Sequence, residues 1–215
     1  MKKKLLMAVP KGRILEELIP LLEKADIIPE PDFFSSSSRK LIFKTNRENL
    51  DLARVRSFDV ATFVQFGAAD IGICGLDVLK EFTSADIFSV LDLGIGKCHL
   101  SIAAKKSTAQ KLDLESRSHI RIATKYMAIA SDYFSELGVQ VEAIKLNGAI
   151  EIAPELNLCD FILDLVSSGK TLAENDMVEI KNILEVSSHL VVNRTSFKTA
   201  NSELNQLIQK FDAIN

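Results

Sequence analysis

Short apolar runs alternate along the chain with segments whose apolar residues recur at helical spacing. Several of the runs lack polar alternation, which is typical of strands covered on both faces. Because strands alternate with helical segments, the pattern predicts βαβ units and an α/β fold with mostly parallel sheets. The nine predicted strands are 5–9, 41–45, 71–74, 90–93, 100–104, 120–124, 141–145, 161–165 and 190–192.

Helical patterns fill the gaps between these runs. One begins near Gly12 and carries apolar residues at helical spacing from 14 to 22. Two others, 60–66 and 126–137, are each followed by a glycine, the residue that most often ends a helix. An amphipathic pattern over 196–214 predicts a last helix.

The number of strands predicts two lobes. Nine strands are many for one compact sheet in 215 residues, and the polar segment 105–118 marks a change of character. We therefore expect a first lobe of 1–97 plus 190–215, with the last helix returning to it, and a second lobe of 98–189. Ligands often bind in the cleft between two such lobes.

Composition narrows the function classes. A chain that is 47% hydrophobic builds real cores, and a net charge of −3 gives no global basic field, so no nucleic-acid partner is expected. The cysteines show no zinc-binding spacing and suit a reducing compartment. The apolar run 5–9 is too short for a secretory signal or a membrane span, so we expect a cytoplasmic protein without a membrane partner.

The segment 161–175 carries the most specific chemistry. An apolar strand with Asp164 near its end runs into a Ser/Gly loop and then a helix beginning at Thr171. Unpaired backbone N–H groups in such a loop cradle phosphate, and an adjacent carboxylate suits sugar hydroxyls or a magnesium shell. The alternative is an ordinary strand–loop–helix connection capped by Thr171.

Cations follow the first predicted strand. Lys11 and Arg13 stand at a helix start, where they oppose the helix dipole, so they suggest an anion clamp rather than a structural device. Solvation of the surface is the competing interpretation.

A pair of arginines, Arg54 and Arg56, lies on an extended segment. Two residues apart, they are expected on one face, where their repulsion is relieved by an anion between them. The alternative is ion pairing with Asp51 and Asp59.

Three further residues are weaker candidates. Gly75 ends a strand and lets a nucleotide approach the backbone, Lys97 follows two glycines, and Glu151 begins a helical turn. Each also has a structural interpretation: a helix start, a hinge, and an acid that favours the helix dipole. The histidines show no metal or triad spacing, and each is expected to be structural or exposed.

Taken in order, the motifs resemble those of the ATP phosphoribosyltransferase family. The resemblance runs from about residue 5 to 198 and rests on AVPKGRI, RKLIF.TN, RVRS.DV, GAADIGICG.DVL, DLGIGKC, ATKY, IKLNGAIEIAP, DLVSSGKTL and VNR.S.K. It implies a two-lobed fold like that of type II periplasmic binding proteins, with the active site in the interlobe cleft. It also implies the first reaction of histidine biosynthesis, in which ATP reacts with phosphoribosyl pyrophosphate.

The resemblance, with the residue arguments above, predicts the site. The phosphoribosyl pyrophosphate loop consists of Asp164, Leu165, Val166, Ser167, Ser168, Gly169, Lys170 and Thr171. The expected ATP-binding residues are Lys11, Gly12, Arg13, Gly75, Lys97 and Glu151, and the expected catalytic cations are Arg56, Arg54 and Lys11. Mg²⁺ is expected to arrive on the substrate phosphates, without protein ligands.

The length of the chain predicts its partner subunits, and other sequence features weigh against two competing functions. The chain resembles the short form of the family, which implies a homodimer of catalytic chains within a hetero-oligomer with a regulatory subunit like histidyl-tRNA synthetase. A solute receptor on the same scaffold is one competitor, but receptors of that kind are exported. A salvage phosphoribosyltransferase acting on a free base is another, and the single acid of the loop and the segment 10–13 argue against it.

Overall fold

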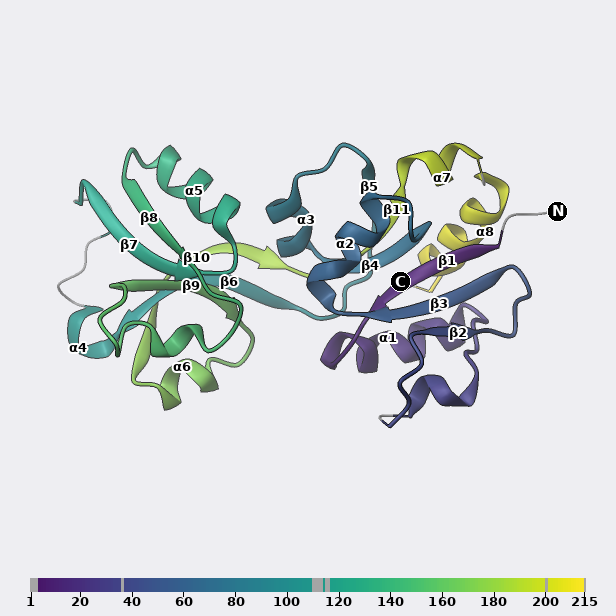
Figure 1. Ribbon diagram of the computed structural model, residues 1–215, viewed down its shortest axis with the longest axis horizontal. Coiled ribbons are helices and arrows are strands. Elements are labelled where there is room, and N and C mark those ends of the chain that lie inside the picture. The colour runs from purple at the N-terminus through teal and green to yellow at the C-terminus, as the bar shows by residue number, and fades with distance from the viewer. Residues whose placement is uncertain (1–3, 36, 110–113, 115–116, 200, 215) are drawn as a thin grey trace. The chain divides into compact units, whose positions relative to one another are not determined.

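The structure is a computed structural model that describes residues 4–35, 37–109, 114, 117–199 and 201–214. The chain forms two compact units, each with its own sheet (Figure 1). Unit 1 contains the described residues up to Gly96 and from Ser187 onward, and unit 2 contains Lys97–Val186. The α/β class predicted from the sequence is confirmed.

The sheet of unit 1 has six strands in the order β2-β3-β1-β4-β11-β5. The strands β1 and β3 are parallel, as are β1 and β4, whereas β2, β11 and β5 join antiparallel. The strands are β1 (Leu5–Pro10), β2 (Ile42–Lys44), β3 (Leu50–Val55), β4 (Ile71–Gly75), β5 (Ile87–Asp92) and β11 (Ser188–Asn193). The helices are α1 (Arg13–Lys24), η1 (Pro31–Phe34), α2 (Ser57–Gln65), α3 (Leu76–Phe82), α7 (Arg194–Thr199) and α8 (Asn201–Asp212).

Helices cover both faces of this sheet. Alternate residues of β1 enter different cores, with Leu5 and Met7 in one and Ala8 in the other. The first core includes α1 and α8, and the second includes α2 and α3. Continuous apolar runs follow from this burial on both sides, as the sequence predicted.

The packing of α2 on β4 depends on Gly72. A Cβ atom at this position would lie 2.6 Å from a methyl group of Val64 and 2.7 Å from one of Val60. Because the strand carries no side chain here, the helix lies close against it. Arg56 directly precedes this helix.

The sheet of unit 2 has five strands in the order β10-β6-β9-β7-β8. The pairs β7–β8 and β7–β9 are parallel, and β6 is antiparallel to both β9 and β10. The strands are β6 (Cys98–Lys105), β7 (His119–Thr124), β8 (Gln140–Lys145), β9 (Phe161–Val166) and β10 (Met177–Val186). The helices are α4 (Lys106–Ala109), α5 (Met127–Glu136), η2 (Ile150–Ile152) and α6 (Lys170–Glu174).

The two sheets correct one prediction. The sequence suggested mostly parallel sheets, but four described strand pairs are parallel and five are antiparallel. The chain enters unit 2 along β6 and leaves along β10 in the opposite direction, and these two strands pair with each other. Because the chain runs in opposite directions along β6 and β10, these two strands can pair only antiparallel.

The other differences concern single elements. β3 and β10 were not among the predicted strands, because charged residues interrupt both and hide their apolar positions. The last predicted helix is two helices, α7 and α8, over the described residues. No helix in the described part of the chain has the length and apolarity that crossing a membrane requires.

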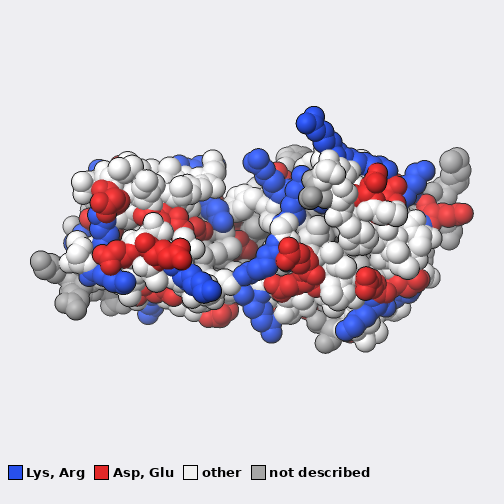
Figure 2. Space-filling view, turned by 90° about the horizontal axis from the view of Figure 1, so that it is seen from below, with Lys and Arg blue, Asp and Glu red and all other residues white. Residues whose placement is uncertain are grey.

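Charged side chains are mixed on the surface. On the face drawn in Figure 2, Lys and Arg side chains alternate with Asp and Glu in small groups on each unit. Elsewhere in the described structure, charged side chains form ion pairs, including Lys40 with Glu30 at 2.6 Å and Arg47 with Asp26 at 3.3 Å. Attraction of an anionic ligand therefore depends on local clusters of cations rather than on a field of one sign.

Candidate active site

The loop after β9 forms one wall of a cavity of about 140 Å³. Gly169 has a φ of +70°, which a residue with a Cβ rarely adopts, and it turns the chain from the strand into α6. The helix begins at Lys170, one residue before the predicted start. The whole predicted loop lines this cavity: Asp164, Leu165, Val166, Ser167, Ser168, Gly169, Lys170 and Thr171.

The predicted acid Glu151 lines the same cavity. It lies in η2, which packs beside β9 through Ile150, a buried residue of the unit 2 core. Two carboxylates that are thirteen residues apart in sequence thus share one small space with the loop. A pentose, with hydroxyl groups that both donate and accept, is a suitable partner for such a pair.

Asp164 has a raised pKa in this cavity. Burial raises its pKa above the ordinary value, the Lys125 ammonium and the Leu165 N–H lower it, and the Glu151 carboxylate raises it. The Leu165 N–H donates to Oδ1 over 2.8 Å, and the Nζ atom of Lys125 lies 3.6 Å from the same oxygen. A perturbed acid in a cavity is a frequent sign of a functional site.

Lys125 was missed by the sequence interpretation. It directly follows β7, which is parallel to β9 in the register Thr124↔Leu163, so both strands end at the same edge of the sheet. The signal was present in the sequence, because a lysine directly after a predicted strand is expected at the carboxyl edge. Only the strand order shows that its neighbour there is Asp164.

Lys97 lies at this same edge of unit 2. It precedes β6, whose first residues pair antiparallel with the end of β9 in the register His99↔Val166. Its side chain is exposed. The structure thus brings Lys97 to the edge that carries the loop.

In unit 1, the other predicted cations gather at the carboxyl edge of three strands. The parallel register Pro10↔Val55 brings the ends of β1 and β3 together, and the Lys11 N–H donates to the Val55 carbonyl over 3.0 Å. Gly75 ends β4, the other parallel neighbour of β1. The predicted residues at this edge are Lys11, Gly12, Arg13, Arg56 and Gly75.

The side chains at this edge differ in their contacts. Lys11 and Arg56 are exposed, and Arg13 is exposed but pairs with Glu17 at 3.7 Å. Gly12 has a φ of +84°, which lets the chain turn from β1 into α1. Cations at the ends of parallel strands, beside the starts of α1 and α2, form a surface suited to polyphosphate.

Arg54 has a different environment from Arg56. Its guanidinium donates to the carbonyls of Phe33, at 2.8 Å, and Ser38, at 3.3 Å, and stacks on the Phe43 ring with its central carbon 5.0 Å from the centroid. These contacts hold the segment after η1 against the sheet. Within the described structure Arg54 therefore performs a structural task, and its predicted catalytic role stays a prediction.

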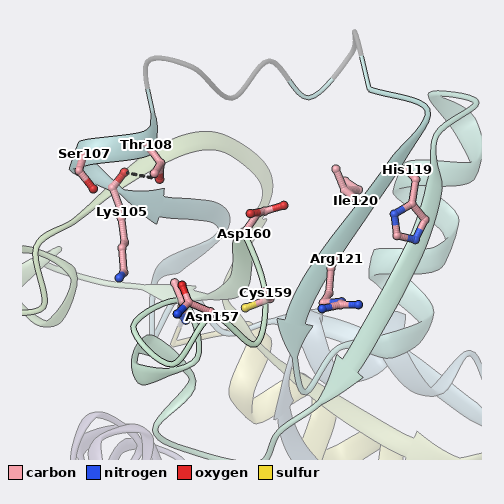
Figure 3. A pocket seen from close by; sticks show the side chains of 10 residues that line it. Lys105, Ser107, Thr108, His119, Ile120, Arg121, Asn157, Cys159 and Asp160 are labelled. Carbon is pink, nitrogen blue, oxygen red and sulfur yellow. Dashed lines mark hydrogen bonds between the residues drawn. The ribbon is translucent and has the colours of Figure 1, made fainter.

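A second cavity, of about 370 Å³, lies at the opposite edge of the unit 2 sheet (Figure 3). It is lined from the end of β6, at Lys105, and from the beginnings of β7 and β9, at Arg121 and Asp160. These charges are paired: Lys105 with Glu155 at 2.7 Å, Arg121 with Glu142 at 2.9 Å, and Asp160 with Arg117 at 3.3 Å. The charges of this cavity are thus compensated, and the cavity beside the loop is the better candidate for a phosphate group because backbone N–H groups and hydroxyls of a Ser/Gly loop line it.

Comparison with known proteins shows relatives that match nearly the whole chain. The family model described as HisG, ATP phosphoribosyltransferase, matches residues 56–213. The chain belongs to the ATP phosphoribosyltransferase family. The family's ATP phosphoribosyltransferase from Rhodospirillum rubrum is 52% identical over 97% of this chain and 92% of that protein. The one from Novosphingobium aromaticivorans is 51% identical over 98% of this chain and 94% of that protein.

Solved structures extend the family comparison to the fold. The ATP phosphoribosyl transferase (HisG:HisZ) complex from Thermotoga maritima matches at 29% identity and a TM-score of 0.80, covering 98% of both chains. The VFT2 domain of Bordetella pertussis BvgS matches with a TM-score of 0.60 and the GluR0 ligand-binding core with 0.57, each at 10% identity. These two share the fold alone, which confirms the predicted likeness to periplasmic binding proteins.

Proposed function

We propose that this protein transfers the phosphoribosyl group of phosphoribosyl pyrophosphate to N1 of the adenine of ATP. The products are phosphoribosyl-ATP and pyrophosphate, and the reaction is the first step of L-histidine biosynthesis. The observation that carries the proposal is the shared cavity of Asp164, Glu151 and the Ser167–Gly169 loop in a chain of this family. The alternative of a solute receptor has only the fold in its favour.

The loop of unit 2 binds phosphoribosyl pyrophosphate in this proposal. Backbone N–H groups and hydroxyls of Ser167, Ser168 and Thr171 take the 5′-phosphate, because Gly169 allows close approach of the chain. Asp164 and Glu151 face the pentose hydroxyls. The cavity composition supports this division, since a phosphate next to both carboxylates would be repelled.

The cations of unit 1 bind the polyphosphate of ATP and stabilise the leaving group. Lys11, Arg13 and Arg56 stand at the ends of β1 and β3, with Gly12 and Gly75 giving the nucleotide access to the backbone. As the C–O bond to pyrophosphate breaks, charge grows on the leaving oxygens. Cations fixed there stabilise the transition state more than the ground state. In this proposal Lys97 and Arg54 add to the positive charge around the substrate phosphates.

No general base is required for this reaction. Adenine N1 carries a lone pair and attacks the anomeric carbon directly, so orientation of the two substrates supplies much of the rate. The described residues contain no group of three or more His, Cys, Asp or Glu side chains placed to hold a metal. In this proposal, Mg²⁺ carried on the substrate phosphates would neutralise charge that the protein cations do not reach.

The solved relative supports a proposal about the subunits with which this chain assembles. The Thermotoga maritima structure is a complex of HisG with HisZ, and this chain matches it over nearly its full length. We propose the same kind of hetero-oligomer here, with a homodimer of catalytic chains bound to a subunit like histidyl-tRNA synthetase. The proposed location is the cytoplasm, where both substrates are made.

One assay tests the proposed function. The purified chain, alone and with a HisZ-like subunit, is incubated with ATP, phosphoribosyl pyrophosphate and Mg²⁺, and formation of phosphoribosyl-ATP is followed by absorbance. The same mixture with adenine in place of ATP detects salvage activity on a free base. Product in the ATP mixture, with none in the adenine mixture, supports the proposal. Product only from adenine, or binding of substrates without turnover in both mixtures, would refute it.

A further inference from the structure

Ser101 is a buried hydroxyl without a protein partner. It lies in the middle of β6 and is 1% exposed. In the described structure, its Oγ atom has no hydrogen-bond partner. Burying a hydroxyl without a partner is unfavourable, and an alanine would fill the same position in the strand without this penalty. A residue of this kind becomes a candidate for ligand binding where it also lines a cavity.

The register of the sheet directs Ser101 into the loop cavity. Ser101 pairs with Asp164, and Ala103 pairs with Ile162, across the antiparallel strands β6 and β9. Paired residues of neighbouring strands lie on the same face of a sheet. All four residues line the cavity formed by the loop and Glu151. Ser101 thus forms part of the cavity floor, directly beside the carboxylate of the site.

We propose that Ser101 is a substrate-binding residue whose hydroxyl bonds to a pentose hydroxyl of phosphoribosyl pyrophosphate, beside Asp164. The inference rests on the proposed function of this cavity. A pentose hydroxyl both donates and accepts, so it satisfies the Ser101 oxygen and the Asp164 carboxylate together. A phosphate group fits this position less well, because the Asp164 carboxylate repels it and the loop that suits it begins only at Ser167.

The test compares Ser101→Ala with a matched variant, Ser188→Ala. Ser188 is also 1% exposed and also has an Oγ atom without a partner, but it lies in unit 1. Calorimetry with phosphoribosyl pyrophosphate and Mg²⁺ is expected to show binding to Ser101→Ala weakened about tenfold, the loss of one good hydrogen bond. Ser188→Ala is expected to bind like the wild type. Both variants are expected to melt at or above the wild-type temperature.

Titration with inorganic phosphate and ribose 5-phosphate assigns the contact. Ser101→Ala should lose affinity for ribose 5-phosphate and keep its affinity for inorganic phosphate. Equal losses for both ligands would overturn the assignment to the pentose. A Ser101→Cys variant, with a weak donor of similar size, should fall between wild type and alanine, and it serves if the alanine variant folds poorly.

The two proposals fail in different ways. If the wild-type chain does not bind phosphoribosyl pyrophosphate, the function proposed for this cavity is wrong. If the wild type binds it and Ser101→Ala and Ser101→Cys bind it equally well, the cavity assignment stands and the role of Ser101 is wrong.

Discussion

At the scale of single residues, Asp164 lies in surroundings that disfavour its ionised form. Burial raises its pKa, and the nearby Glu151 carboxylate adds to the effect, whereas Lys125 at 3.6 Å only partly compensates. A buried acid with incomplete pairing weakens a fold. Such residues persist where binding or catalysis needs them, which is the trade between stability and function common at active sites.

Replacement of Asp164 by asparagine tests this directly. Because the folded pKa lies above the ordinary value of about 4, the folded state binds more protons than the unfolded state between these two values, and stability falls as pH rises through that window. Asp164→Asn cannot ionise, so its free energy of unfolding in urea should exceed that of the wild type at pH 7. The difference should vanish when both are measured below the ordinary pKa.

The same variant should bind phosphoribosyl pyrophosphate more weakly, because the amide replaces an acceptor with a donor at the pentose. Calorimetry measures this. Wild-type affinity in Asp164→Asn would show that the carboxylate has no part in substrate binding.

The exposed Arg56 is predicted to act in the chemical step. Arg56→Ala should lower turnover by about 10²- to 10³-fold, the usual loss for one group that stabilises developing charge, while ATP binding changes much less. Steady-state and single-turnover rates measure the first effect, and calorimetry measures the second. Lys24→Ala, which removes another exposed cation of unit 1, is the control and should turn over normally. An unchanged chemical rate in Arg56→Ala would contradict the assignment.

Arg54 is predicted to act on stability. Its guanidinium reaches the carbonyls of Phe33 and Ser38 and stacks on Phe43, a set of contacts that a lysine cannot reproduce. Arg54→Lys should lower the free energy of unfolding by about 2 kcal/mol in urea titration. Arg56→Lys, at an exposed position, should change it by less than about 0.5 kcal/mol. Equal stability of the two variants would show that the contacts of Arg54 contribute little.

At the scale of elements, one asparagine joins three of them. The Nδ2 group of Asn193, at the end of β11, donates to the Val64 carbonyl of α2 over 2.7 Å. Its Oδ1 atom accepts from the N–H groups of Thr195 and Ser196, at 2.9 and 3.0 Å, and so caps the start of α7. The neighbouring Asp70 accepts from the Ser196 hydroxyl over 2.6 Å. This network attaches α7 to the sheet.

Asn193→Ala should therefore destabilise unit 1. It removes a helix cap, at about 1 kcal/mol, and the side-chain donor to the Val64 and Gln65 carbonyls at the end of α2, at about 1 to 2 kcal/mol more. Urea unfolding should show a loss of about 2 to 3 kcal/mol, without loss of binding of phosphoribosyl pyrophosphate by unit 2. A loss below about 0.5 kcal/mol would mean that other groups satisfy these helix ends.

The elements also show where sequence patterns were enough. The strands and helices with continuous or periodic apolar residues, such as β1, α1 and α5, were predicted to within a residue or two. β3 and β10 were missed, because Asp51 and Arg54 interrupt the first and several charges interrupt the second. Both strands owe their conformation to pairing with a neighbour, β1 or β6, and pairing leaves no mark on local hydrophobicity.

At the scale of the whole molecule, the chain is divided so that unit 2 is one continuous segment. Its first and last strands pair with each other, with Cys98 opposite Val186. Unit 2 also has its own core, which includes Ile162 and Ile150. A segment with adjacent ends and a separate core has what a small domain needs to fold alone.

A fragment of residues 97–186 is thus expected to fold and to melt cooperatively by circular dichroism. If the loop of unit 2 binds phosphoribosyl pyrophosphate as proposed, the fragment should bind it with Mg²⁺, although more weakly than the whole chain. It should bind ATP much more weakly than the whole chain, since Lys11, Arg13 and Arg56 belong to unit 1. A folded fragment that binds ATP and not phosphoribosyl pyrophosphate would reverse the assignment of the two substrates.

The sequence by itself determined the class of fold, most strands, the loop with Asp164 and the cations after β1, because these depend on local patterns and on residue types with distinctive chemistry. Only the tertiary structure decided which of these residues meet. The strand order places Lys125 and Ser101 beside Asp164, and it places Lys11 beside the end of β3. Side-chain packing brings the Arg54 guanidinium to the carbonyl of Phe33. Contacts between residues distant in sequence depend on pairing and packing in three dimensions, and no local pattern contains that information.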